Sequence, residues 1–334
     1  MGKPLPTMTL AKDAFPDPDR LSRHFQGRAE LRFEDISTPE AVRAATVGAD
    51  VIIVMTHRLT GEILAAMDRQ VRVIGRAGVG LDAIDIEAAK ALGVTVFNEP
   101  DYGVSEVASH AVGLMLALHR KFQASDSFVR EGWTGRVKFG PMKPVDELVV
   151  GLLGYGRIGR RVATYLESMV ERVVVYDPYV TEVPAAVTRV ETLRDLLTRS
   201  DVVSLHVPRT EETVGLLGRE ELALLPENAI LVNVARGGLV DEEALSELLA
   251  VRHLAGAGLD VFADEPLPPD AAILRAPNTL LTPHSAALSD RAMWRLGWWT
   301  VSDAIEWLGS RSLTYGSLVL DGAASASASG GRAW

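Results

Sequence analysis

The sequence predicts an α/β protein with two doubly wound domains. A chain of 334 residues is longer than one ordinary hydrophobic core organises. Short apolar runs alternate with helical patterns along most of it, which is typical of βαβ units and parallel sheets. A loop-like stretch at residues 132–147, rich in Gly, Pro, Lys and Trp, interrupts the alternation. A second series of strands and helices starts after it.

The first series of elements lies before this loop. Buried strands are predicted at 51–54, 71–74 and 94–97, with a helix at 86–92. One long buried helix is predicted at 105–122. Its histidines, His110 and His119, are interpreted as core or helix-end residues.

The second series follows the loop and is stronger. Buried strands are predicted at 148–153, 173–176, 202–207, 230–234, 258–262 and 279–281. Helical segments separate most of them, which indicates a doubly wound sheet. The Trp-rich segment 293–308 has helical spacing and is interpreted as core or subunit interface. The Ala/Ser/Gly-rich tail, 322–334, cannot bury a core and is predicted to be disordered.

Composition narrows the function classes. The chain is 47% hydrophobic and 23% charged, as globular proteins are, and its net charge of −10 argues against a nucleic-acid partner. The absence of cysteine excludes disulfides, thiolate nucleophiles, Cys-zinc sites and iron–sulfur clusters, and no metal site is predicted. No apolar stretch approaches a membrane span, and residues 1–12 do not resemble a secretory signal. We therefore expect a cytoplasmic protein without a membrane partner.

The strongest functional signal is a glycine-rich turn between a predicted strand and a predicted helix. Gly154 permits a tight turn, Gly156 lets a pyrophosphate approach the backbone, and Gly159 lets the helix pack closely on the strand. The N-terminus of the helix offers free N–H groups to the phosphates. This pattern predicts a dinucleotide site.

An acid at the end of the next strand indicates which dinucleotide binds. Asp177 stands near the expected spacing of about 20 residues past the glycine turn. Its carboxylate can accept hydrogen bonds from the adenine ribose hydroxyls and would repel a 2′-phosphate. The sequence therefore favours NAD over NADP.

Three later strands also end in polar residues, where ligands of open α/β sheets bind. Arg236 can hold a carboxylate or carbonyl through charge-assisted contacts. His284 is suited to exchange a hydroxyl proton while hydride moves. Glu265 can orient the imidazole and favour its protonated form. Each residue alone is more readily explained as structural, but together behind an NAD site they predict hydride-transfer chemistry.

The order of these motifs resembles the D-isomer-specific 2-hydroxyacid dehydrogenase family, which includes phosphoglycerate, glycerate and D-lactate dehydrogenases. The resemblance covers residues 51–289. It rests on the segments 76–82, 154–159 with Asp177, 205–208, 233–237, 258–266 and 282–284.

The resemblance implies roles for particular residues. Arg236, Glu265 and His284 are the implied catalytic set, and Arg236 and His284 also contact the substrate. Backbone amides at Val79, Gly80 and Leu81 would hold the substrate carboxylate. Besides the three glycines, the implied cofactor-lining residues are Arg157, Ile158, Asp177, Pro178, His206, Val207, Pro208, Thr213, Val234, Ala235, Arg236, Asp260, His284 and Ala286. Asp260 would lie near the nicotinamide amide.

The resemblance also implies the domain plan. A Rossmann NAD-binding domain, residues 104–286, would be inserted into a flavodoxin-like substrate domain made of residues 1–103 and 287–321, with catalysis in the cleft. Members are commonly dimers, so we expect a homodimer with the helix at 105–122 in its interface.

Residues 101–108 and 284–286 look most like the branch that contains the C-terminal-binding-protein corepressors and their bacterial enzyme relatives. The sequence departs from the family at Ser109, where an acid is usual, and at 144–147, where a Gly-x-Thr turn is usual. After residue 289 the match is poor, so the substrate side-chain pocket cannot be transferred.

Two functions from different classes remain. The first is NAD-dependent interconversion of a small D-2-hydroxy acid and its 2-oxo acid. The second is an NAD(H)-sensing, corepressor-like binding protein with little turnover. The intact Arg236, Glu265 and His284 favour the enzyme, and Glu265 disfavours formate oxidation, whose branch carries an amide there. The identity of the acid does not follow from these residues.

Overall fold

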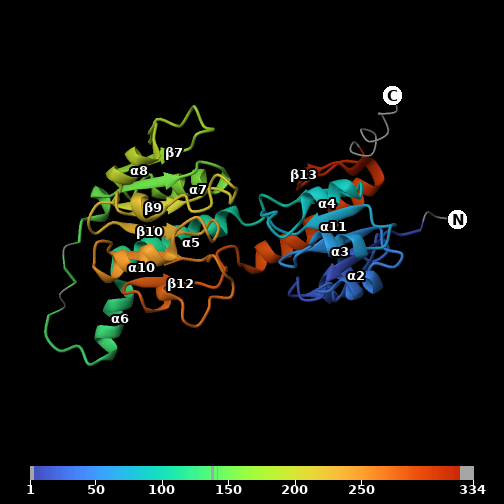
Figure 1. Ribbon diagram of the computed structural model, residues 1–334, viewed down its shortest axis with the longest axis horizontal. Helices are drawn as coiled ribbons and strands as arrows, with labels where there is room; N and C mark the ends of the chain where they lie inside the picture. The colour runs from blue at the N-terminus through green and yellow to red at the C-terminus, as the bar shows by residue number, and fades with distance from the viewer. Residues whose placement is uncertain (1–3, 137–138, 141, 324–334) are drawn as a thin grey trace. The chain divides into compact units, whose positions relative to one another are not determined.

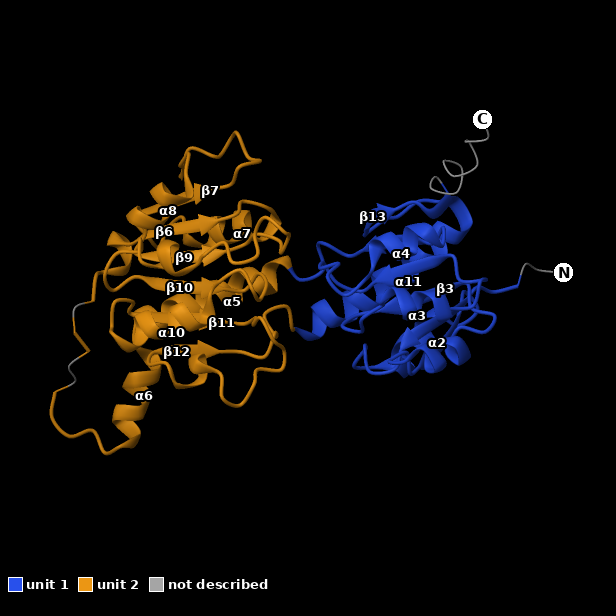
Figure 2. Cartoon of the chain, viewed as in Figure 1, with its two compact units in different colours: residues 1–103, 289–334 blue, residues 104–288 orange. Residues whose placement is uncertain are grey.

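The computed structural model describes residues 4–136, 139–140 and 142–323. The chain divides into two compact units, coloured separately in Figure 2. Unit 1 comprises residues 1–103 and 289–334, and unit 2 comprises residues 104–288. The second boundary predicted from the sequence lies after residue 286, two residues earlier.

Unit 1 is built on a six-stranded sheet with the order β13-β5-β4-β3-β1-β2. Its strands are β1 (Thr7–Ala11), β2 (Glu30–Glu34), β3 (Val51–Val54), β4 (Val73–Arg76), β5 (Thr95–Asn98) and β13 (Ser317–Leu320). All pairs are parallel except β13 with β5. The order 2-1-3-4-5 is that of flavodoxin-like sheets, which confirms the predicted class of this unit.

Helices cover the sheet of unit 1. They are α1 (Pro18–Phe25), α2 (Pro39–Ala45), α3 (Gly61–Ala66), α4 (Ile86–Ala91) and α11 (Asp290–Ser310). The Trp-rich α11 packs on β3 and β4 and contributes Leu296, Val301 and Trp307 to the core. Its close approach needs a glycine beneath it, because a Cβ at Gly75 would lie 2.8 Å from Thr300 Cγ2. The predicted helix 293–308 is therefore present, and it belongs to the core of unit 1.

Unit 2 contains a seven-stranded parallel sheet with the order β12-β11-β10-β9-β6-β7-β8 (Figure 1). Its strands are β6 (Val149–Leu153), β7 (Arg172–Tyr176), β8 (Val187–Arg189), β9 (Val202–Leu205), β10 (Ile230–Asn233), β11 (Gly256–Leu259) and β12 (Thr279–Leu281). Numbered within the unit, this is the Rossmann order 3-2-1-4-5-6 with one added edge strand. The topological switch point lies between β6 and β9, where such folds bind ligands.

The sheet of unit 2 has a hydrophobic core on each face. The helical segments are α5 (Val104–His119), α6 (Phe122–Arg130), η1 (Val145–Glu147), α7 (Arg157–Leu166), α8 (Leu193–Arg199), α9 (Arg219–Leu222), α10 (Glu242–Ala250) and η2 (Ala272–Arg275). Residues of α5 and α7 contribute to one core, and residues of α8, α9 and α10 to the other. This is the predicted doubly wound arrangement.

The predicted buried helix at 105–122 is present as α5, but it ends three residues earlier than predicted. Helix α5 ends at His119, Lys121 adopts a left-handed conformation with φ 56°, and a second helix, α6, begins at Phe122. The apolar side of α5 packs inside unit 2, where Leu114 would meet a Cβ at Gly258 at 2.9 Å. By contrast, α6 has no buried residue.

Every predicted strand is present, with ends displaced by at most three residues, and the predicted strands did not include β1, β2, β8 and β13. The predicted disordered tail lies outside the described residues from residue 324 onward. Its first residue, Gly322, is buried and donates its N–H to Thr95 Oγ1.

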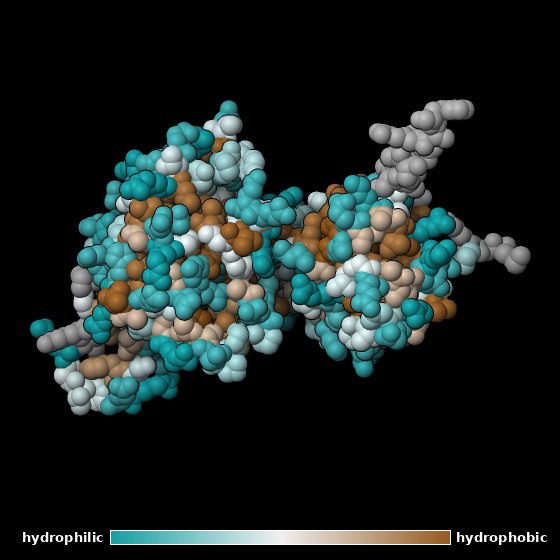
Figure 3. Space-filling model, viewed as in Figure 1, coloured by the Kyte–Doolittle hydropathy of each residue, from teal (hydrophilic) through white to brown (hydrophobic). Residues whose placement is uncertain are grey.

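The visible surface is largely hydrophilic with scattered hydrophobic residues (Figure 3). Among the described residues, no helix is both long and apolar enough to span a membrane. Within the same ranges, no group of three or more His, Asp and Glu side chains is arranged to hold a metal ion.

Candidate active site

The glycine turn lies at the switch point of unit 2, between the end of β6 and the start of α7. Gly154 has φ 97°, and a Cβ there would lie 2.7 Å from the carbonyl oxygen of His206. A Cβ at Gly159 would lie 2.4 Å from the carbonyl oxygen of Gly154. Both positions therefore require glycine for packing.

Gly156 differs from its two neighbours in the motif. A Cβ there would meet no atom within 4 Å, so the space beside this residue is open. Gly156 is the N-cap of α7, and no side chain caps the free N–H groups of that helix. The open space beside an uncapped helix N-terminus fits the pyrophosphate of a dinucleotide.

Asp177 follows β7 and faces the glycine turn. Its Oδ2 accepts the N–H of Tyr155 at 2.8 Å, and its Oδ1 accepts the N–H of Tyr179 at 2.9 Å. Two backbone donors thus fix a carboxylate beside the turn, while each oxygen keeps a lone pair for a ligand hydroxyl. Pro178, the next residue, is exposed.

The segment after β9 packs against the turn from the other side. A Cβ at Gly154 would lie 2.9 Å from Val207 Cγ1. His206 bonds Ser204 Oγ at 2.9 Å through Nε2, and burial lowers its pKa to about 3, so the ring is neutral. Its Nδ1 is buried without a partner in the described part of the chain. Thr213 Oγ1 donates to the carbonyl of Pro208 at 2.7 Å and thereby closes this segment.

Arg236 lies in a turn after β10, behind the buried Val234 and Ala235. Asn233 brackets the turn, because its Nδ2 donates to the carbonyl of Arg236 at 2.8 Å and its Oδ1 accepts the N–H of Ala235 at 3.0 Å. The guanidinium donates through Nη1 to the carbonyl of Ala235 at 2.6 Å. The asparagine of the sequence Asn-x-x-Arg thus fixes the turn that carries the arginine.

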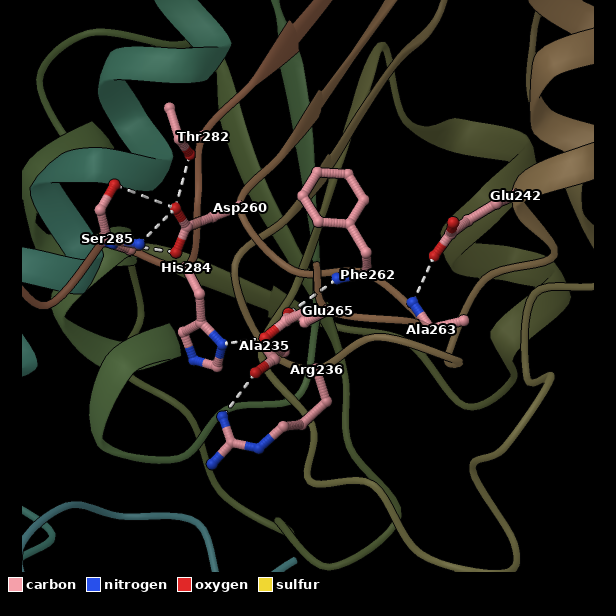
Figure 4. Close-up of polar contacts among 11 residues, drawn as sticks. Ala235, Arg236, Glu242, Asp260, Phe262, Ala263, Glu265, Thr282, His284 and Ser285 are labelled. Carbon is pink, nitrogen blue, oxygen red and sulfur yellow. Dashed lines mark hydrogen bonds and ion pairs between the residues drawn. The ribbon is translucent and has the colours of Figure 1, made fainter. Parts of the chain in front are cut away.

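His284 and Glu265 form a close pair. His284 Nδ1 lies 2.7 Å from Glu265 Oε2, and Glu265 Oε1 accepts the N–H of Phe262 at 3.0 Å. Figure 4 shows this pair beside the guanidinium of Arg236. With Nδ1 engaged, His284 presents Nε2 for proton exchange with a ligand, and 53% of its side chain is exposed.

Asp260 organises the turn that carries His284. Its main-chain carbonyl accepts the N–H of His284 at 2.8 Å, and its buried carboxylate accepts the N–H groups of Ser285 at 2.8 Å and Ala286 at 2.9 Å. Thr282 Oγ1 also donates to this carboxylate, at 2.5 Å. The network supports the left-handed conformation of His284, which has φ 51°. The resemblance implied that Asp260 lies near the nicotinamide amide. In the structure, its carboxylate accepts hydrogen bonds from Thr282, Ser285 and Ala286.

His110 belongs to this network, although sequence analysis interpreted it as a packing residue. Its Nε2 lies 3.0 Å from Thr282 Oγ1 and 3.8 Å from Asp260 Oδ1. His119, on the same helix, is buried at the helix end as predicted, and burial lowers its pKa. No sequence pattern separates the two, because only the course of α5 past β12 brings His110 to the site.

Val79, Gly80 and Leu81 lie in unit 1, in the turn after β4. The carbonyl of Val79 accepts Asn98 Nδ2 at 2.7 Å, and that of Gly80 accepts Arg76 Nε at 2.8 Å. Among the described residues, no acceptor bonds the backbone N–H groups of the three. Backbone N–H groups without an acceptor in the chain can bind an anion such as a carboxylate.

The chain is also similar in sequence and in fold to known proteins. The model of the D-isomer specific 2-hydroxyacid dehydrogenase NAD binding domain matches residues 112–286. The D-3-phosphoglycerate dehydrogenase of Mycobacterium tuberculosis is 40% identical over 81% of this chain, but the match covers only 51% of that protein. The chain thus spans about half the length of such relatives.

Other relatives match over most of their length. The glycerate dehydrogenase of Methylorubrum extorquens is 36% identical over 82% of this chain and 88% of that protein. The solved structure of an NADPH-dependent glyoxylate/hydroxypyruvate reductase from Sinorhizobium meliloti, in complex with NADP and malonate, is 29% identical with a TM-score of 0.83. That match covers 94% of this chain and 97% of the other.

Proposed function

Because this chain belongs to the D-isomer specific 2-hydroxyacid dehydrogenase family, we propose that it interconverts a small D-2-hydroxy acid and its 2-oxo acid, using NAD(H). The observation that carries the proposal is the contact of 2.7 Å between His284 Nδ1 and Glu265 Oε2, beside Arg236. An imidazole oriented in this way can exchange a proton, and a neighbouring guanidinium can polarise a carbonyl.

In the direction of reduction, each residue has a defined task. The amides at Val79, Gly80 and Leu81 bind the substrate carboxylate, and the guanidinium of Arg236 polarises the 2-oxo group. NADH, when bound by unit 2, would supply the hydride for C2 of the 2-oxo acid. The protonated His284 gives its Nε2 proton to the oxygen that becomes the hydroxyl, while Glu265 stabilises the charged ring through Nδ1.

The cofactor is held by unit 2. We propose that the pyrophosphate lies in the open space beside Gly156, at the N-terminus of α7. Asp177 would accept hydrogen bonds from the adenine ribose hydroxyls, and its charge disfavours a 2′-phosphate. The rest of the site is lined by the segments 206–208 and 234–236, together with Thr213 and Ala286. The phosphates and the ribose are flanked by Arg157, Ile158 and Pro178. By contrast, the solved structure of the Sinorhizobium meliloti relative is in complex with NADP.

The assembly and the compartment are also proposals. We propose a homodimer, and the exposed apolar side chains of Phe122, Val129 and Trp133 favour the α6 segment over α5 as its interface. The acidic, cysteine-free composition supports a cytoplasmic enzyme.

A coenzyme-oxidation screen tests the proposed function. A panel of 2-oxo acids with different side chains is mixed with the protein and either NADH or NADPH, and coenzyme absorbance is followed. We expect at least one acid to be reduced, with NADH preferred. Binding of NADH without turnover of any acid in the panel would favour the corepressor-like alternative.

A further inference from the structure

A residue outside the proposed catalytic set contacts the loop that carries Glu265. Glu242 is the first residue of α10, and Asp241 caps this helix by accepting the N–H groups of Glu243 and Ala244. The side chain of Glu242 reaches the neighbouring loop, where its Oε1 accepts the N–H of Ala263 at 2.7 Å (Figure 4).

The backbone of Phe262 and Ala263 is held at three points. The N–H of Ala263 donates to Glu242, and the N–H of Phe262 donates to Glu265 Oε1 at 3.0 Å. The carbonyl of Phe262 lies against Gly237, where a Cβ would come within 1.7 Å of the carbonyl oxygen. A shift of this backbone therefore moves the carboxylate of Glu265, whose other oxygen holds His284.

Two anchors of this backbone come from one short segment. Gly237 follows Arg236 directly, and Glu242 lies at the end of the same connection between β10 and α10. The loop of Glu265 is thus tied to the segment that carries Arg236. From that segment, the side chain of Glu242 bonds the loop directly through the N–H of Ala263.

A carboxylate at this place has an electrostatic cost. Burial raises the pKa of Glu242, and the nearby charges of Asp264, Glu265 and Asp241 raise it further. A charged acceptor also makes a stronger bond to an N–H donor than a neutral one. The carboxylate of Glu242 therefore lies near three other acids and accepts a hydrogen bond from the N–H of Ala263.

We propose that Glu242 is a positioning residue for the proton-exchanging pair. Through the N–H of Ala263 it fixes the loop 260–266, so that Glu265 Oε2 stays against His284 Nδ1. The catalytic consequence rests on the proposed function, whereas the orientation of His284 does not.

The kinetic test compares Glu242→Ala, Glu242→Gln and, as a control, Glu243→Ala on the exposed side of the same helical turn. We expect Glu242→Ala to lower kcat about tenfold or more with little change in KM, because the reacting groups are misplaced. Glu242→Gln keeps an oxygen acceptor for Ala263 and retains most of kcat, and Glu243→Ala leaves kcat unchanged.

A double-mutant cycle shows whether Glu242 acts through Glu265. In the Glu265→Ala background, Glu242→Ala should cost little more, because no pair remains to be misaligned. Losses of kcat that simply multiply would overturn the positioning role, and so would equal losses in Glu242→Ala and Glu242→Gln.

A second readout needs no turnover. Long-range ¹H–¹⁵N correlation spectra report the tautomer of each imidazole, and the signal of His284 is identified by its loss in His284→Gln. We expect His284 to be the Nδ1-protonated tautomer in the parent chain and in Glu242→Gln. In Glu242→Ala we expect a mixture of tautomers similar to the mixture in Glu265→Ala. An unchanged His284 signal in Glu242→Ala refutes the positioning role. If the tautomer changes as expected while no 2-oxo acid is reduced, the proposed function fails and the positioning role stands.

Discussion

Nδ1 of His284 lies 2.7 Å from Oε2 of Glu265, and the main-chain N–H of the same histidine donates to the carbonyl of Asp260 at 2.8 Å. The ring and the backbone of His284 are therefore fixed by two different acids. This leaves Nε2 as the ring nitrogen that can reach a ligand, and it makes the histidine the most direct target for mutagenesis.

We expect His284→Ala to lower reductive turnover by about 10²–10⁴-fold, the usual contribution of general acid–base catalysis. The affinity for NADH should change little, because the glycine turn and Asp177 are untouched. Steady-state rates and a fluorescence titration with NADH measure the two effects. A fully active His284→Ala variant would contradict the assigned role.

Asp177→Asn tests the basis of coenzyme choice. The amide oxygen can still accept one backbone N–H, but the negative charge is lost, so repulsion of a 2′-phosphate disappears. We expect kcat/KM for NADPH to rise at least several-fold relative to that for NADH. Glu182→Gln, an exposed acid in the following loop, is the matched control and should leave the ratio unchanged.

Two alanine variants distinguish a glycine needed for ligand binding from a glycine needed for packing. They are Gly156→Ala and Gly159→Ala. An alanine methyl at 156 meets only open space in the chain, so thermal stability should be kept while the Kd for NADH rises. A methyl at 159 lies 2.4 Å from the carbonyl oxygen of Gly154, so stability and binding should both fall. Calorimetric melting and NADH titration of both variants check this contrast, and equal Kd values for Gly156→Ala and the parent would exclude the proposed pyrophosphate position.

Glu99 predicts a pH dependence of stability in unit 1. Its side chain is fully buried beside Asp303, and burial, with the charges of Asp303 and Asp101, raises its pKa from 4.5 to about 9. The folded state thus keeps a proton that the unfolded state releases, and this contribution is complete below pH 4.5 and is lost as pH rises to about 9. The slope is at most about 1.4 kcal/mol per pH unit.

The neutral isostere Glu99→Gln removes this contribution. Thermal midpoints between pH 6 and pH 9 should fall less steeply in Glu99→Gln than in the parent chain. Glu87→Gln, the same change at an exposed site, should follow the parent. Parallel curves for all three proteins would show that Glu99 does not titrate as described.

The proposed interface at Phe122, Val129 and Trp133 predicts that a charge placed there changes the oligomeric state. Val129→Asp places a charge on a helix that has no buried residue in the single chain. We expect the dimer to dissociate at micromolar concentration while the melting temperature of the monomer stays near that of the parent at high dilution. Light scattering measures the mass, and a monomeric parent would remove the proposed dimer itself.

The two sheets could be predicted from the sequence wherever a strand is buried on both faces. β3 is fully buried and matches its predicted bounds, because its apolar run ends where the strand does. β12 also matches, although it is a partly exposed edge strand. β1 was missed although it is fully buried, since Thr7 and Thr9 interrupt its apolar run. β2 and β13 lie at sheet edges and are half-exposed, so they carry no such run.

The residues that take part in the site divide in a similar way. The glycines, Asp177, Arg236, Glu265 and His284 stand at strand ends with recognisable spacing, so local sequence identifies them. His110, Thr282 and Glu242 acquire their contacts only when separate elements meet. The break at Lys121 was missed for another reason, since a lysine with φ 56° carries none of the usual signals of glycine or asparagine.

The assembly of unit 1 from two distant segments has a consequence for biosynthesis. β13 pairs with β5, and α11 completes the core over β3 and β4. The ribosome makes all of unit 2 before either α11 or β13 emerges, which takes on the order of ten seconds or more. During that interval the hydrophobic residues of β3 and β4 that α11 will cover remain exposed. Until α11 emerges, the nascent chain is therefore exposed to aggregation and to chaperone capture through the uncovered core of unit 1.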